Sequence, residues 1–142
     1  NNGVMEQVGI PKEIYSKPNT RFVAEFIGSP QMNLFDCSIV NGTVNLPGSS
    51  LSLGGSINIE QASLGIRPDD IIINNNGQFS TKVDIVEYLG SDMIVYASLG
   101  SQKFSCKISS KTHFSVGDEF RFDIQSSSVH LFDKKDDKRV NL

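Results

Sequence analysis

From residue 34 onward, the chain consists of short runs in which apolar and polar residues alternate, separated by glycine or asparagine turns. In EFRFDI, residues 119–124, Phe120, Phe122 and Ile124 alternate with charged residues. Successive side chains of a strand point to opposite faces, so this pattern predicts strands with one buried face. Strands are expected at 34–40, 43–46, 63–71, 79–90, 92–100, 102–108, 119–124 and 129–132, with a weaker one in 49–56. A small barrel or sandwich of short antiparallel strands is favoured over an α/β fold.

The first 28 residues have a different pattern, which predicts two short helices. Pro11 suits the first turn of a helix, and Pro18 forces the residue before it to be extended, so the first helix is one or two turns long. Asn19 or Thr20 can cap a second helix that ends at Gly28. Its apolar residues share one side at helical spacing: Phe22, Val23, Phe26 and Ile27. Helices this short are marginal alone, so these faces must pack on something.

Composition excludes several classes of protein. The formal net charge is −3, and lysine and arginine form no cluster of the kind that binds phosphate backbones. No apolar run approaches the roughly 20 residues that cross a bilayer, and we expect no signal peptide. Cys37 and Cys106 each lie in an apolar alternation, so two buried thiols in a reducing compartment are expected. The first residue is not Met, which suggests a piece of a longer protein.

Residue patterns that carry chemistry are missing from the sequence. No window has the G-x-x-x-x-G-K-[ST] spacing of a phosphate-binding loop. His113 and His130 are the two histidines, and neither has the neighbours of a hydrolytic triad or a zinc site. Asp69 and Asp70 are adjacent in the chain, which in a strand directs them to opposite faces. We therefore expect no catalytic, metal or cofactor site.

The stretch GVMEQVGIPKEIYSKPNTRFVAEFIGSPQMNLF closely resembles the end of the ATP-binding subunit of sugar ABC importers. The resemblance continues in order through LGIRPDD, VEYLGSDMIVYASLG, VGDEFRF and VHLFD, and so covers nearly the whole chain. The Ile-Gly-Ser-Pro-x-Met-Asn form is similar to the maltose, glycerol-phosphate and multiple-sugar branch. One departure is Ile10, where the family usually has threonine. Loss of that hydroxyl cap costs on the order of 1 kcal/mol and puts the first helix in doubt.

The resemblance implies a division of the chain. Residues 1–33 would be the tail end of the ATPase domain with linker helices, and residues 34–142 a regulatory TOBE domain, an oligonucleotide-fold-like barrel. The ATPase core, with its ATP and Mg, would lie upstream, so this chain is expected to be no enzyme and to hold no cofactor. Implied partners are a second copy of the subunit, the permease subunits through the ATPase domain, and a regulatory protein, but no nucleic acid. The implied location is cytoplasmic, at the inner face of the membrane.

An alternative, based on fold relatedness, is a barrel that senses a small ligand such as a sugar or an oxyanion. Under either function, the residues that match the family's motifs are candidates for an interface. They are Gly28, Ser29, Pro30, Met32, Asn33, Arg67, Pro68, Glu87 and Gly90.

Two expectations concern how these parts meet. Arg67 either contacts the upstream ATPase or partner domain, or pairs within the fold with Asp69, Asp70 or Glu87. Residues before Gly28 are expected to be mobile, displaced or packed on a neighbouring molecule rather than docked on their own barrel, because the apolar stripe of the second helix would otherwise belong to the ATPase side.

Overall fold

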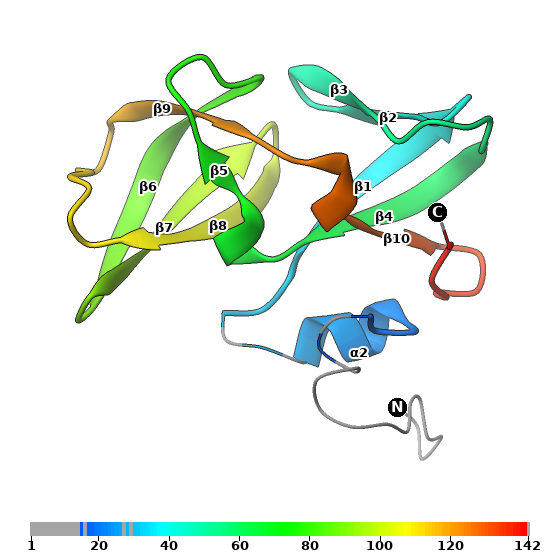
Figure 1. Cartoon of the computed structure of the whole chain (residues 1–142), viewed down its shortest axis with the longest axis horizontal. Helices are drawn as coiled ribbons and strands as arrows, with labels where there is room; N and C mark the ends of the chain where they lie inside the picture. Colours follow the sequence, from blue (N-terminus) through cyan, green and yellow to red (C-terminus); the bar gives the residue numbers. More distant parts are fainter. Residues whose placement is uncertain (1–14, 16, 27, 29, 142) are drawn as a thin grey trace.

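The computed structural model describes residues 15, 17–26, 28 and 30–141, and within these residues the chain is mainly β (Figure 1). The first sheet has strand order β10-β4-β1-β2-β3, and every neighbouring pair is antiparallel. The Asn41-Gly42 pair, with φ values of 49° and 74°, makes the tight turn from β1 to β2 that the sequence predicts. The strands are β1 (Asn33–Val40), β2 (Thr43–Leu46), β3 (Ser49–Ser52), β4 (Ile59–Ile66) and β10 (His130–Asp133).

The second sheet has strand order β5-β9-β6-β7-β8, again antiparallel throughout. Its strands are β5 (Ile72–Ile73), β6 (Phe79–Leu89), β7 (Asp92–Leu99), β8 (Gln102–Ser109) and β9 (Glu119–Asp123). Pro68 ends β4 and starts a short 3-10 turn, η1 (Pro68–Asp70), as expected of a residue that cannot donate to a ladder. A second turn, η2 (Ser126–Ser128), leads into β10.

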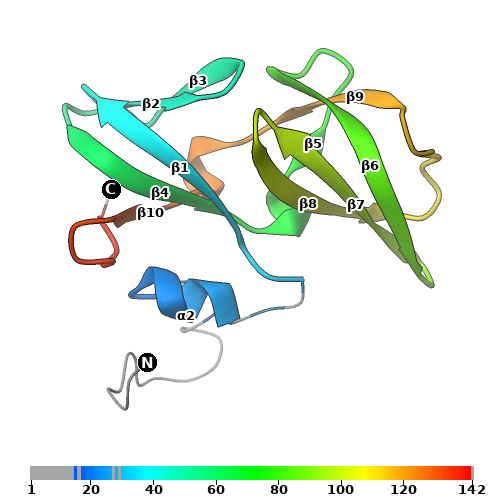
Figure 2. The ribbon, with the colours of Figure 1, turned by 180° about the vertical axis from the view of Figure 1, so that it is seen from behind.

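The single small barrel expected from the sequence is therefore two sheets that face each other as a half-barrel (Figures 1 and 2). Side-chain amides, not strand ladders, bridge the sheets. Asn33 of β1 bonds the backbone of Ser105 on β8, and Gln102 of β8 bonds the backbone of Asp36 on β1. Away from β1 and β8, the side-chain amide of Gln78 donates to the carbonyl of Ser50 on β3. These bonds join single residues, and β1 and β8 belong to different sheets that do not pair along a ladder.

The two sheets share one hydrophobic core. Aromatic rings join them: the centroids of Phe35 on β1 and Phe104 on β8 are 5.7 Å apart, and Phe104 continues to Phe122 on β9 at 5.1 Å. Phe79 stacks on Phe122 at 5.3 Å. The alternation that predicted Phe120, Phe122 and Ile124 as inward-facing is confirmed, because all three are buried. Such interlocked rings stabilise a core beyond the area that they bury.

One short α-helix, α2 (Arg21–Phe26), is present among the described residues, instead of the two that the sequence predicts. The first expected helix falls on residues mostly outside the described ones. The expected separation of α2 from the sheets is wrong: Val23 and Ala24 are buried, and Ala24 packs with Met32 and Phe132. In Figures 1 and 2, α2 lies against the β10 side of the first sheet. The buried Ala24 of the helix therefore has its packing partners within the chain.

Backbone and side-chain bonds hold α2 in this position. Arg21 donates through Nε to Asp137 at 2.7 Å, and its amide donates to the carbonyl of Asp137 at 3.1 Å. Thr20 caps the helix, because its hydroxyl oxygen accepts from the amide of Val23 at 3.2 Å. In the described part of the chain, no helix is long and apolar enough to cross a membrane.

Candidate functional site

The residues that match family motifs divide into two groups in the structure. Gly28, Pro30 and Met32 lie on the segment between α2 and β1, which we call the crossing segment, and Asn33 begins β1. This stretch meets Arg67 and Pro68 because Asn33 pairs with Ile66 at the end of β4. Glu87 and Gly90 lie instead in the hairpin of β6 and β7. Ser29 is outside the described residues. We call the first group, with Arg67 and Pro68 included, the crossing site.

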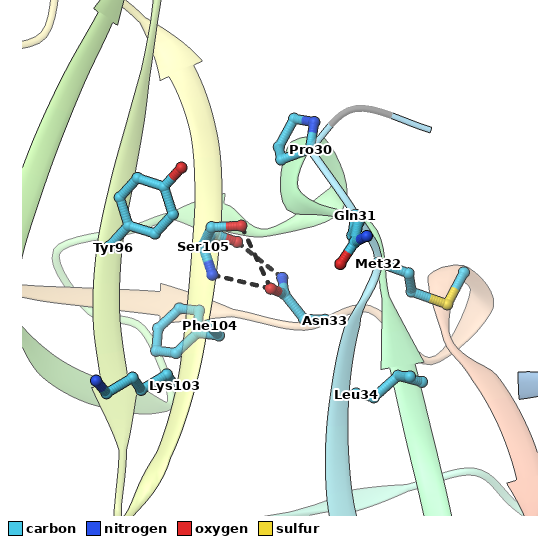
Figure 3. Close-up of a pocket in the computed structure, with 9 residues that line it drawn as sticks. All are labelled: Pro30, Gln31, Met32, Asn33, Leu34, Tyr96, Lys103, Phe104 and Ser105. Atoms are coloured by element: carbon cyan, nitrogen blue, oxygen red, sulfur yellow. Dashed lines mark hydrogen bonds between the residues drawn. The ribbon is translucent and has the colours of Figure 1, made fainter. Parts of the chain in front are cut away.

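Asn33 is the best-defined member of the crossing site. It is buried, its Nδ2 donates to the carbonyl of Ser105 at 2.7 Å, and its Oδ1 accepts from the amide of Ser105 at 2.8 Å (Figure 3). The side-chain amide thus replaces the backbone of a missing neighbouring strand at the edge of β8. An asparagine is needed here because one group must both donate and accept.

A cleft of about 350 Å³ opens beside this bond. Figure 3 shows Pro30 and Gln31 of the crossing segment on one side and Tyr96 and Lys103 of the second sheet on the other. Its floor includes Asn33 and Ser105, whose polar groups already bond each other. The cleft is thus a seam between the sheets with one cationic group, Lys103, at its wall.

Arg67 holds the segment that precedes β1. Its side chain is buried, with 2% exposed, and an Nη atom donates to the carbonyl of Tyr15 at 2.8 Å. The guanidinium also lies 4.1 Å from the centre of the Tyr15 ring, a cation–π contact. Burial lowers the pKa of Arg67, whereas the negative charges of Asp69 and Asp70 act to raise that pKa.

These contacts bear on the two roles expected for Arg67, a contact to the ATPase side or a pair with carboxylates of its own fold. Arg67 donates a hydrogen bond to Tyr15, in the range expected to be the ATPase-side tail, and Asp69 and Asp70 act on its charge through space. Gly28 makes this approach possible. A methyl group there would lie 2.9 Å from Nη1 of Arg67 and 3.1 Å from Cε2 of Tyr15, and its φ of 102° suits glycine.

The comparisons with known proteins agree with this architecture. Residues 64–132 match the TOBE domain. They form a TOBE domain. This TOBE domain holds Arg67, Pro68, Glu87 and Gly90, whereas α2 and β1 to β3 lie before its first residue, although the first sheet is incomplete without β1.

Relatives extend the similarity beyond the TOBE domain. The chain is 35% identical over 142 residues to an sn-glycerol-3-phosphate import ATP-binding protein UgpC from a Ruegeria species, covering 99% of the chain and 40% of the relative. It is 34% identical to UgpC of Psychromonas ingrahamii, covering 100% of the chain and 41% of the relative. UgpC 2 of Agrobacterium fabrum is 36% identical over 147 residues. The chain thus spans about two fifths of the length of the relatives that it matches.

Within the TOBE domain, the second group of motif residues forms a hairpin tip. Gly90, with a φ of 69°, occupies the first position of the two-residue turn after β6, as a type II′ turn requires. Glu87 is exposed on β6. The exposed apolar side chains Ile85, Tyr88 and Leu89 surround it. This tip carries polar and apolar groups without a partner in the described part of the chain.

Sequence reasoning missed a second arginine, the half-buried Arg139. Arg139 donates through Nε to the carbonyl of Pro18 at 2.7 Å, and its Nη2 lies 2.7 Å from Nδ1 of His130. Burial, together with the charges of Arg139 and Arg67, lowers the pKa of His130 to about 4. The neutral ring therefore accepts the hydrogen bond from Arg139. The mixed run 133–139 contained Arg139, but nothing in its pattern separated this residue from the exposed charges beside it.

The other histidine and the two cysteines differ in their exposure. His113 is exposed. Cys106 is buried and Cys37 half-buried, both as free thiols, and burial raises their pKa values to about 12 and about 11. Among the described residues, no group of three His, Cys, Asp or Glu side chains is placed to hold a metal ion.

Proposed function

We propose that the chain is the regulatory and dimerisation domain of the ATP-binding subunit of a carbohydrate ABC importer. One observation carries the proposal: similarity to glycerol-3-phosphate import ATP-binding proteins covers 99% of this chain but 40% of the relative. ATP and Mg would then bind in the remaining part of such a subunit. Hydrolysis would not reside in these 142 residues.

The attachment of the N-terminal segment supports this proposal. Arg67 and Arg139 bond the carbonyls of Tyr15 and Pro18, and α2 is buried against β10 through Ala24. A regulatory domain must pass a change of orientation to the domain that precedes it, and a docked helix does so better than a free linker. On this proposal, residues 1–33 are the tail end of the ATPase domain with its linker helices, and residues 34–142 are the regulatory domain.

The partners follow from the same proposal. A second copy of the subunit pairs with it, permease subunits bind through the ATPase domain, and a regulatory protein binds the TOBE domain. The complex would lie at the cytoplasmic face of the membrane and import a sugar or a sugar phosphate.

Solution mass and nucleotide binding test the proposal together. Light scattering of the 142-residue chain is expected to give twice the 15.6 kDa mass at high concentration. Equilibrium dialysis with an ATP analogue and Mg is expected to show no binding. A strict monomer would remove the dimerisation function, and nucleotide binding would contradict the assignment of ATP to another part of the subunit.

A second candidate function is favoured by the cleft of about 350 Å³ with Lys103 and Tyr96 at its wall. A small-ligand sensor could hold a sugar phosphate or an oxyanion there. Calorimetry with glycerol 3-phosphate, maltose and sulfate separates the two functions. Heat that disappears in Lys103→Ala supports the sensor, and no heat with any of the three rejects it.

A further inference from the structure

The strand β6 has a free edge over its second half. On one side it pairs with β7 from Val83 to Leu89, but on the other side its pairing with β9 runs from Phe79 to Lys82 and stops. The segment before β9 bonds Val83 and goes no further along β6. Among the residues that the structure describes, no strand pairs with residues 84–89 on this side.

The register shows which backbone groups face this edge. Leu89 and Asp92 flank the two-residue turn and form the first hydrogen-bonded pair, and bonded pairs alternate with non-bonded ones along an antiparallel ladder. The N–H and C=O groups of Val86 and Tyr88 therefore point away from β7. The same alternation from the next turn places the N–H and C=O of Ser105 on the outer edge of β8, where Asn33 bonds them.

Apolar side chains accompany the free edge. Tyr88 is 66% exposed, Ile85 59% and Leu89 51%, and Val116, on the segment that bonds Val83, is 70% exposed. Figures 1 and 2 show the hairpin of β6 and β7 projecting beyond the rest of the second sheet. An exposed strand edge with apolar side chains is a template for an added strand.

The charges beside the edge indicate the occupant. Asp84 and Glu87 of β6 and Asp118 and Glu119 of the adjoining segment are exposed. Lys82 pairs with Glu119 at 3.9 Å and is the neighbouring cation. A second copy of the chain would bring the same acidic residues against this edge, whereas a basic segment would complement it.

We propose that residues 84–89 of β6 receive an extended segment of a partner protein, in which lysine or arginine alternates with apolar side chains, as an added strand of the second sheet. The backbone groups of Val86 and Tyr88 supply the ladder bonds. Ile85 and Leu89 supply apolar contacts on one face of the added strand, and Glu87 selects for positive charge. This inference does not depend on the proposed transport function.

Amide hydrogen exchange of the 142-residue chain tests the proposal with two short peptides, one of alternating lysine and valine and the other of alternating glutamate and valine. The lysine peptide is expected to slow exchange at Val86 and Tyr88 on the order of tenfold or more at saturation. The glutamate peptide should leave both amides unchanged. No slowing with the lysine peptide, or equal slowing with both, would overturn the proposal.

Two variants identify the contacts. Glu87→Lys is expected to weaken binding of the lysine peptide roughly two- to fivefold, the range that an exposed ion pair supplies. The matched control is Glu60→Lys, an exposed glutamate on β4 of the other sheet, which should leave binding unchanged. If both variants weakened binding equally, the effect would come from net charge alone, and the proposed site would be wrong. Protection at Val86 that grows with protein concentration, together with a doubled mass, would make a second copy the occupant instead.

Discussion

Asn33 and Ser105 are 72 positions apart in the chain, and the side chain of one exchanges two hydrogen bonds with the backbone of the other. Nδ2 to O is 2.7 Å and N to Oδ1 is 2.8 Å. Asn33 is thus the first residue of β1 and also a one-residue substitute for a strand along β8. Any change that moves the crossing segment relative to β8 must break this bond.

Asn33→Ala is expected to lower the free energy of unfolding by about 1–3 kcal/mol, because the buried amide and carbonyl of Ser105 lose their partner. Urea denaturation measures the loss. The matched control is Asn45→Ala at an exposed position of β2, for which a change within about 0.5 kcal/mol is expected. If both variants lost the same stability, the bond would contribute nothing beyond a surface asparagine.

The strand pattern was predictable because alternation and turn residues are local properties of the sequence. The Asn41-Gly42 turn and the inward side of β9 follow from a few neighbouring residues. Closure of the sheets was not predictable, because it depends on amides such as Gln102, which bonds Asp36 from 66 positions away. Sequence marks Gln102 as an ordinary polar residue at the end of a hairpin.

The crossing site was predictable from family motifs as a set of residues but not as contacts. The sequence left open whether Arg67 contacts the ATPase side or pairs with nearby carboxylates. In the structure, Tyr15, 52 positions away, accepts one of its hydrogen bonds. The docking of α2 was also missed. Its burial involves Ala24, a small residue outside the large apolar stripe, which packs with Met32 and Phe132.

Arg67 and Tyr15 are expected to be energetically coupled. In a double-mutant cycle with Arg67→Met and Tyr15→Ala, the coupling energy should be about 0.5–2 kcal/mol, the value of a cation–π pair that is partly desolvated. Chemical denaturation of the four proteins gives this energy. The matched cycle of Arg67→Met with Glu87→Gln should give a coupling near zero. A larger coupling to Glu87 would restore the carboxylate pairing as the role of Arg67.

Gly28→Ala is expected to destabilise the chain more than Gly90→Ala. Both glycines have positive φ, so both variants suffer backbone strain of about 1–2 kcal/mol. A methyl group at Gly90 meets nothing within 4 Å, whereas one at Gly28 lies 2.9 Å from Arg67. The difference between the two variants, measured by urea denaturation, therefore reports the Arg67–Tyr15 contact. If it vanished in the Arg67→Met background, the contact would be confirmed as its source; a difference that persisted there would contradict this.

Stability is expected to fall between pH 6.5 and pH 4 because of His130. Its pKa is lowered to about 4 in the folded chain, mainly by burial, from an ordinary value near 6.5. Between these values the unfolded chain binds more protons, so the free energy of unfolding rises with pH in this window and is lost as pH falls through it. The shift corresponds to about 3 kcal/mol, and solvent screening of the partly exposed ring makes the effect smaller than this. It is measured by urea denaturation at several pH values.

His130→Gln should remove most of this slope, since glutamine does not titrate but can still accept from Arg139 through its side-chain oxygen. His113→Gln, at an exposed position, is the matched control and should keep the slope. Arg139 also bonds the carbonyl of Pro18, in the segment before α2. Protonation of His130 places a positive charge beside the Arg139 guanidinium and so weakens its hold on this segment. The protection factor of the Arg21 amide, which bonds Asp137, is the exchange rate corrected for the pH dependence of intrinsic exchange. It should therefore fall toward pH 4 in the native chain but not in His130→Gln. An unchanged protection factor at Arg21 would show that His130 affects stability without loosening α2.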